Sequence, residues 1–117
     1  MLLYQYPKCT TCKKTVKWLE ENNISYTSRN IKEENPSYYE LLEIYEKSGL
    51  PLKKFFNTSG LLYRSMGLKD KLNDMSDEEM LKLLATDGML VKRPILITES
   101  AVLVGFKESV WAETIGL

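Results

Sequence analysis

Histidine is absent from this chain of 117 residues, and only two cysteines are present. Without histidine, a Ser-His-Asp catalytic set is excluded. A zinc site within one chain is disfavoured as well, because tetrahedral zinc needs four ligands and two cysteines without histidine cannot supply them. Only a zinc site shared across a dimer stays open. No glycine-rich phosphate loop and no paired-carboxylate constellation is present either.

Net charge is also absent, since Lys and Arg total 16 and Asp and Glu total 16. Such a balance offers no field that would attract nucleic acid or an anionic membrane, so we expect neither as a direct partner. No apolar run approaches the length of a membrane helix, and the short apolar start lacks the features of a signal peptide. We therefore expect a cytoplasmic protein, in a compartment where a disulfide is more often catalytic or sensory than structural.

The two cysteines, Cys9 and Cys12, stand three positions apart in the chain. A short apolar run before them predicts a buried strand, and an amphipathic pattern after them predicts a helix. Cys9 is then expected at or just before the helix start, and Cys12 in the first turn. Unpaired N–H groups and the helix dipole favour negative charge there, and Lys8 and Lys13 add positive charge. This pattern favours a nucleophilic Cys9 thiolate, with Cys12 near enough to close a reversible disulfide.

Two other uses of the cysteines compete with redox chemistry. Both residues could be ordinary small hydrophobic side chains, the commonest fate of cysteine in a folded chain. A purely structural disulfide would close a very small loop, which restricts the unfolded chain least. A CxxC that opens a helix after an N-terminal strand is typical of thioredoxin-like redox proteins. Redox chemistry is therefore the favoured interpretation.

The remaining strands are predicted from β-rich segments. Residues 24–29 predict a second strand, which makes a βαβ unit with parallel strands. Near the end of the chain, residues 91–98 and 101–105 predict a hairpin, with a turn between them and a short helix after it. The hairpin would complete a four-stranded mixed sheet.

The segment from about 32 to 90 predicts only helices and turns. Ser37 is a candidate N-cap, and Ser76 opens a capping box in which a glutamate follows three residues later. This segment has no core pattern large enough to indicate a second domain. We expect one α/β domain over residues 1–117, with an all-helical insert between the second and third strands.

Three stretches resemble the ArsC/Spx family: YQYPKCTTC at residues 4–12, RNI at 29–31 and KRPI at 92–95. The resemblance extends over essentially the whole chain. It implies a thioredoxin-like fold with a helical insert. The family includes arsenate reductases and the Spx transcription regulators, so the resemblance implies two different functions.

In the arsenate reductases of this family, arginines surround a cysteine at the position of Cys9 and hold the oxyanion. Arg93 matches one of these arginines, whereas Lys53 stands at the position of another and Gly105 at a third. The resemblance implies a thiol-dependent oxidoreductase in which Cys9 attacks, Cys12 resolves and Arg93 stabilises anionic oxygens. Weak oxyanion binding is expected, because lysine lacks the planar fork of donors that arginine offers.

The expected substrate-binding residues are Lys8, Thr10, Thr11, Lys53 and Pro94. Pro94 matches the family's cis-proline, which lies beside the reactive cysteine and offers backbone groups to a substrate. The substrate would be a small oxyanion or a disulfide. We expect a monomer with no bound cofactor and no metal, reduced by glutathione or by the dithiol of a glutaredoxin or thioredoxin.

The alternative function is that of an Spx-like redox-sensing regulator without turnover. The Spx proteins also carry a CxxC here, an arginine before the proline and an insert glycine that resembles Gly49. They bind the C-terminal domain of the RNA polymerase α subunit. This chain reads Asn57-Thr58-Ser59-Gly60 where Spx is arginine-rich, and it stops soon after its last predicted helix, without their basic extension. The enzyme is therefore favoured.

Overall fold

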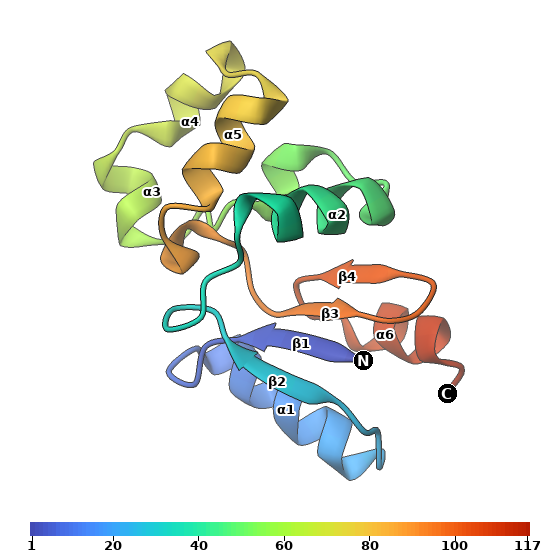
Figure 1. Cartoon of the computed structure of the whole chain (residues 1–117). Helices are drawn as coiled ribbons and strands as arrows, with labels where there is room; N and C mark the ends of the chain where they lie inside the picture. The colour runs from blue at the N-terminus through green and yellow to red at the C-terminus, as the bar shows by residue number, and fades with distance from the viewer. The chain divides into compact units, whose positions relative to one another are not determined.

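Four short strands form one mixed sheet in the order β2–β1–β3–β4 (Figure 1). The computed structural model describes all 117 residues. The strands span Leu2–Gln5 (β1), Thr27–Asn30 (β2), Ile95–Ile97 (β3) and Val102–Val104 (β4). β1 pairs in parallel with β2, as a helical crossover requires, and β3 pairs antiparallel with both β1 and β4. The predicted four-stranded mixed sheet and its hairpin are confirmed.

Two helices belong to the segments that form the sheet, α1 (Thr10–Glu21) and α6 (Glu108–Ile115). The segment between β2 and β3 holds the helices α2 (Tyr38–Ser48), α3 (Leu61–Ser65), α4 (Leu68–Lys71) and α5 (Asp77–Leu84) and the 3-10 turns η1 (Leu52–Phe55), η2 (Leu72–Asp74) and η3 (Gly88–Leu90). One isolated antiparallel bridge, between Phe56 and Val91, interrupts the helical character of this segment. The α/β architecture with a helical insert is thereby confirmed. None of the helices combines the length and the apolar composition needed to cross a membrane.

The second strand is shorter than its sequence pattern predicts. It was expected from residue 24, but β2 begins at Thr27, which pairs with Leu2 at the start of β1. The N–H of Ile24 instead donates to the carbonyl of Leu19 at 3.0 Å, closing the end of α1. The side chain of Ile24 packs against the core below the sheet. Its β-branched character therefore serves packing rather than strand pairing.

The third strand is also shorter, spanning three residues of the predicted 91–98. The N–H of Lys92 donates to the carbonyl of Phe55 at 2.8 Å, and Val91 forms the bridge with Phe56. Pro94 has no N–H to offer a neighbouring strand. Local β-propensity did not determine where β3 begins, because the backbone groups of Val91 and Lys92 are hydrogen-bonded or bridged to Phe55 and Phe56.

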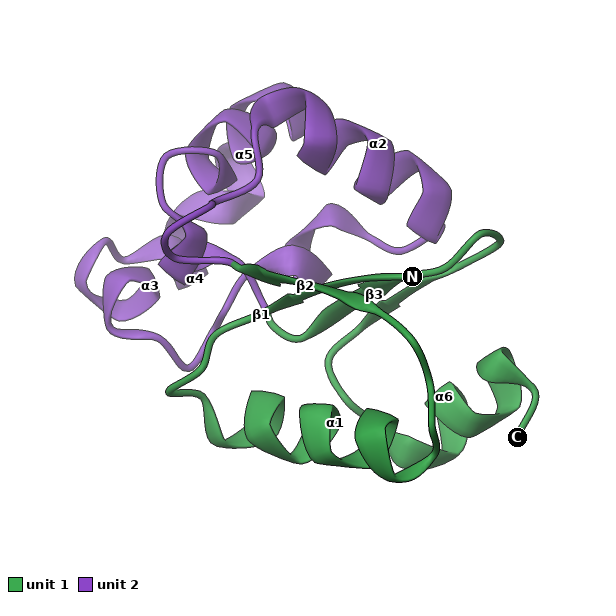
Figure 2. Ribbon diagram, turned by 60° about the horizontal axis from the view of Figure 1, so that its bottom comes forward, with its two compact units in different colours: residues 1–30, 93–117 green, residues 31–92 purple.

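The chain divides into two compact units, residues 1–30 with 93–117 (unit 1) and residues 31–92 (unit 2), as Figure 2 shows in colour. In unit 1, α1 and α6 cover the same face of the sheet. The core between them consists of the buried side chains Leu3, Leu19, Leu96, Leu103 and Trp111. Trp111 donates from its indole Nε1 to the carbonyl of Gly105 at 2.9 Å, so its one polar group is satisfied.

Unit 2 has buried apolar residues of its own, in every one of its helices and turns except α3. Its two ends lie together. A Cβ added to Gly88 would stand 1.7 Å from the carbonyl oxygen of Ile31, so only glycine permits this close approach. Nearby, the side-chain amide of Asn35 donates to the carbonyl of Ala85 at 2.9 Å. The expectation of one domain with an insert of about 32–90 stays a prediction.

Candidate dithiol site at the start of α1

The turn before α1 brings Cys9 to the helix start. The N–H of Cys9 donates to the carbonyl of Tyr6 at 2.9 Å, which closes a turn with Pro7 at its second position, where the fixed φ of proline fits. Cys9 itself has extended backbone angles, φ −87° and ψ 124°, and is the N-cap of α1. Its carbonyl accepts the first helical hydrogen bond, from the N–H of Lys13 at 3.0 Å. The predicted place of Cys9, just before the helix, is confirmed.

The sulfur of Cys9 occupies the position of a capping group. The N–H of Cys12 donates to Cys9 Sγ at 3.4 Å, and both cysteines are free thiols. Partial burial raises the pKa of Cys9, but hydrogen bonds from Cys12 and from the Arg93 side chain, and the positive charge of Arg93, outweigh burial and lower it. Cys9 is therefore the more readily ionised of the two thiols. Lys8 and Lys13 are not among the groups that shift this pKa.

Cys12 has the opposite environment. Its side chain is fully buried, and burial is the largest cause that raises the pKa of Cys12 to about 12. A hydrogen bond to Cys9 and the charge of Cys9 raise it further, while the N–H of Tyr6, which donates to Cys12 Sγ at 3.5 Å, lowers it only in part. Cys12 therefore loses its proton at a higher pH than Cys9 does.

Arg93 reaches this site from the other end of unit 1. It immediately precedes Pro94, and the peptide bond between them is cis, as the family resemblance implies. The carbonyl of Pro94 accepts from the N–H of Gly105 at 2.8 Å, which ties this turn to the end of β4. The Arg93 side chain donates to Cys9. Cys9, Cys12 and Arg93 are thus brought together as the sequence predicts.

Tyr6 is a member of the site that sequence reasoning missed. The guanidinium carbon of Arg93 lies 5.5 Å from the centroid of the Tyr6 ring, a cation–π arrangement. A tyrosine three residues before a cysteine carries no signal of this role, since the contact depends on where Arg93 arrives. In the sequence alone, Tyr6 reads as a core or rim residue.

The remaining predicted site residues have simpler surroundings. Lys8, Thr10 and Thr11 are exposed around the start of α1. Neither threonine hydroxyl is among the groups that shift the pKa of Cys9. Lys53 is exposed in η1 of unit 2, where its Nζ donates to the side-chain oxygen of Asn73. The substrate-binding roles of these residues, and of Pro94, stay predictions.

The backbone conformation at Gly105 disfavours an arginine at this position. Its φ is +73°, in the left-handed region that side chains other than glycine rarely adopt. An arginine placed here would first have to change the backbone that contacts Pro94 and Trp111. Arg93 is the one arginine among the groups that shift the pKa of Cys9. No group of three or more His, Cys, Asp or Glu side chains is placed to hold a metal ion.

Comparison with known proteins shows which family this chain resembles. The family model described as "ArsC family" matches residues 4–114. The uncharacterized protein YusI of Bacillus subtilis is 54% identical over 113 residues, covering 97% of this chain and 96% of that protein. The global transcriptional regulator Spx 1 of Bacillus cereus is 30% identical over 106 residues, covering 91% of this chain and 79% of the regulator. A crystal structure of a possible arsenate reductase from Streptococcus mutans is 42% identical with a TM-score of 0.88, covering 99% of this chain and 97% of that one.

Proposed function

Since the chain belongs to the ArsC family, we propose that it is a thiol-dependent oxidoreductase in which Cys9 attacks and Cys12 resolves. The observation that carries the proposal is the unequal state of the two sulfurs. Cys9 is partly exposed beside Arg93 with a lowered pKa, whereas Cys12 is buried with a pKa raised to about 12. Cys9 is therefore the better nucleophile for the first step, and Cys12 is the thiol that reacts second.

The proposed cycle transfers two electrons to a disulfide. The Cys9 thiolate attacks one sulfur, a mixed disulfide forms, and the other substrate sulfur leaves as a thiolate that takes a proton from water. Cys12 then loses its proton and attacks the sulfur of Cys9, which releases the second substrate thiolate and leaves an intramolecular disulfide. Glutathione or the dithiol of a glutaredoxin or thioredoxin returns the two electrons. Such a cycle suits the cytoplasm, where these reductants keep thiols reduced.

The electrostatics of the pair support this order of steps. The charge of Cys9 is one of the causes of the raised Cys12 pKa, after burial. In the mixed disulfide the sulfur of Cys9 carries no charge, so this cause disappears and the pKa of Cys12 falls. Cys12 therefore becomes more reactive only after Cys9 has reacted.

An oxyanion such as arsenate is the second substrate class. Cys9 would displace one arsenate oxygen as water and form a sulfur–arsenic bond, with Arg93 donating to the remaining oxygens. Attack of Cys12 on Cys9 would then break that bond, leaving its electron pair on arsenic as arsenite departs. With one arginine, and with Gly105 at another arginine position, we expect weak arsenate binding and a high KM.

Turnover assays test the proposal. Purified protein is given arsenate or a glutathionylated peptide, with glutathione, glutaredoxin or thioredoxin as reductant, and a Cys9→Ala variant serves as the control. Turnover that depends on Cys9 is expected, fastest with the mixed disulfide. Arsenate turnover alone would restrict the enzyme to oxyanions. Absence of turnover with every combination of substrate and reductant would refute the proposed enzymatic function.

A regulatory function is favoured by one observation, the similarity to Spx 1, which is a global transcriptional regulator. In that case the disulfide would switch binding to the RNA polymerase α subunit. Gly49 complicates the test, because it ends α2 with φ +67°, so any side chain there strains the helix end. Asn tolerates this conformation better than most residues, so Gly49→Asn is the control for Gly49→Arg. Binding to the α subunit that only Gly49→Arg abolishes would favour the regulator, and no binding in either redox state would exclude it.

A further inference from the structure

Tyr6 contacts all three residues of the dithiol site, Cys9, Cys12 and Arg93. Its ring lies under the guanidinium of Arg93, 5.5 Å from the guanidinium carbon to the ring centroid. Its carbonyl accepts from the N–H of Cys9 at 2.9 Å, and its own N–H donates to Cys12 Sγ at 3.5 Å. The backbone contacts fix the turn and do not depend on the side chain. The ring contact depends on the side chain alone.

The ring contact matters because Arg93 has a long side chain with many rotamers. The negative face of an aromatic ring attracts a guanidinium and also offers a flat surface for stacking. Arg93 in turn donates to the sulfur of Cys9, and its charge favours the thiolate. Whatever restricts Arg93 to this position therefore strengthens its effect on Cys9.

We propose that Tyr6 is a positioning residue whose ring holds the Arg93 guanidinium against Cys9 Sγ. The inference rests on the proposed function, to which it adds a residue that acts through Arg93 and not on the substrate. Besides Arg93, the causes that shift the pKa of Cys9 are its partial burial and hydrogen bonds from Cys12. The hydrogen bonds from Cys12 come from its backbone N–H and its side chain, and the Tyr6 ring takes no part in them.

A matched pair elsewhere in unit 1 provides the control. Arg29 lies over the ring of Tyr4, with 5.0 Å from its guanidinium carbon to the centroid, and its Nη1 donates to the Tyr4 hydroxyl at 3.1 Å. This pair spans β1 and β2, and Arg29 is not among the groups that shift the pKa of Cys9. Removing the Arg29 guanidinium should therefore leave Cys9 unchanged.

The experiment measures the rate of Cys9 alkylation by iodoacetamide against pH, with the modified peptide identified by mass spectrometry. Tyr6→Leu is expected to raise the pKa of Cys9 by about 0.5. Alkylation should be roughly twofold slower than in the wild type below both pKa values and slightly faster above them, because a thiolate of higher pKa is more nucleophilic. Tyr6→Phe, which keeps the ring, and Arg29→Gln should both follow the wild-type profile.

A double-mutant cycle separates positioning from a general structural effect. Arg93→Gln alone is expected to raise the pKa of Cys9, and adding Tyr6→Leu to it should produce no further rise. An equal rise in both backgrounds, or no rise in the wild-type background, would overturn the proposal. Circular dichroism checks folding, and Tyr6→Gln replaces Tyr6→Leu if the latter does not fold. Alkylation needs no substrate, so a protein without turnover would still decide this question.

Discussion

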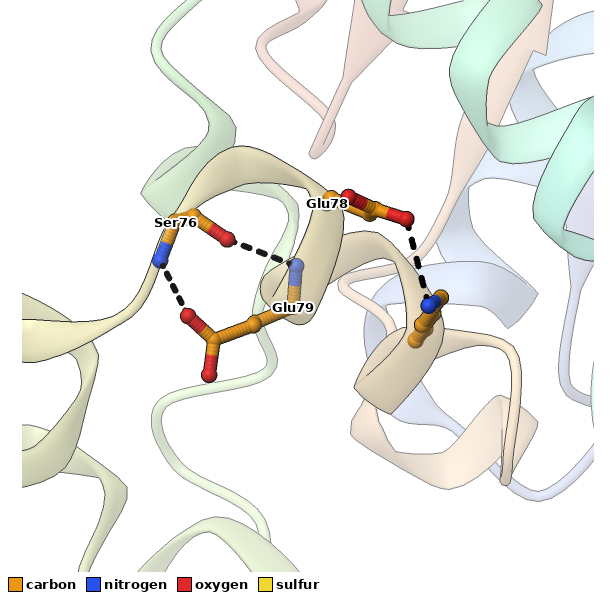
Figure 3. Close-up of polar contacts among 4 residues, drawn as sticks. Ser76, Glu78 and Glu79 are labelled. Atoms are coloured by element: carbon orange, nitrogen blue, oxygen red, sulfur yellow. Dashed lines mark hydrogen bonds and ion pairs between the residues drawn. The ribbon is translucent and has the colours of Figure 1, made fainter.

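The helices α1 and α5 both begin with an N-cap side chain that accepts from the N–H three residues later, but the capping atom is sulfur in α1 and oxygen in α5. At α5, the hydroxyl of Ser76 accepts from the N–H of Glu79 at 3.2 Å, and the carboxylate of Glu79 accepts from the N–H of Ser76 at 3.1 Å (Figure 3). At α1, the sulfur of Cys9 accepts from the N–H of Cys12 at 3.4 Å. Cys12 occupies the place of the glutamate and returns no such bond, since the N–H of Cys9 donates to Tyr6. The α1 cap is thus the weaker one.

The difference shows what each helix start contributes. A serine N-cap stabilises a protein by about 1 kcal/mol relative to alanine, and the capping box satisfies two orphan donors. Sulfur is a weak acceptor, so a cysteine cap contributes less. In return, the helix N–H groups and dipole act on a sulfur that is able to ionise. The α5 start serves stability, whereas under the proposed function the α1 start serves reactivity.

Exchanging the α1 cap for that of α5 should have the largest effect. Cys9→Ser is expected to lower thiol-disulfide exchange by at least about 100-fold, since a hydroxyl at neutral pH is a far weaker nucleophile. The same variant should be as stable as the wild type or more stable, because oxygen is the better cap. Exchange assays and urea denaturation measure the two effects. Cys9→Ala loses both the nucleophile and the capping atom, so it should be less stable than Cys9→Ser. Equal stability of the two variants would refute the capping role.

Cys12 and Glu79, each at the third position of its helix, should make the free energy of unfolding depend on pH in opposite directions. The pKa of Cys12 is raised from 9.0 to about 12, so its contribution to stability is full below pH 9 and is lost as pH rises towards 12. The free energy of unfolding should therefore fall more steeply with pH over this range in the wild type than in Cys12→Ala. Denaturant titrations at several alkaline pH values measure the difference. Parallel curves would show that Cys12 ionises equally in both states.

Removing the α5 cap should have a moderate effect. Ser76→Ala is expected to destabilise the protein by about 1 kcal/mol, since the N–H of Glu79 loses its acceptor. Exchange activity at Cys9 should not change. Urea denaturation and the exchange assay test both statements. The stability of Ser76→Cys, which imitates the α1 cap, should lie between those of the wild type and Ser76→Ala. If Ser76→Cys were as stable as the wild type, sulfur would not be the weaker cap.

The smallest effect is expected at Glu79. Hydrogen bonds from the backbone and side chain of Ser76 lower the pKa of Glu79 below its usual value of 4.5. Its contribution to stability is therefore present above pH 4.5 and lost as pH falls through the lowered pKa. Glu79→Gln should reduce this acid dependence slightly without affecting Cys9. A stability curve in acid identical to that of the wild type would show that the carboxylate charge contributes nothing.

Local sequence patterns were sufficient for the helix starts and for much of the fold. The caps at Ser37 and Ser76 and the position of Cys9 before α1 are all confirmed. Each depends on hydrogen bonds within a few residues, so a short stretch contains all the information. The strand boundaries were predicted less well. Lys92 and Ile24 give their N–H groups to partners that the strand pattern does not reveal.

What the sequence by itself determined is which thiol stands at a helix N-terminus, because the turn at Pro7 and the helix after it are local. Only the tertiary structure decided how the two thiols differ. Burial raises the pKa of Cys12, and Arg93, which lies far along the chain, lowers that of Cys9 from a position over the Tyr6 ring. Burial and charge depend on distances in space, and those distances are set when β3 pairs with β1 and brings the two ends of unit 1 together.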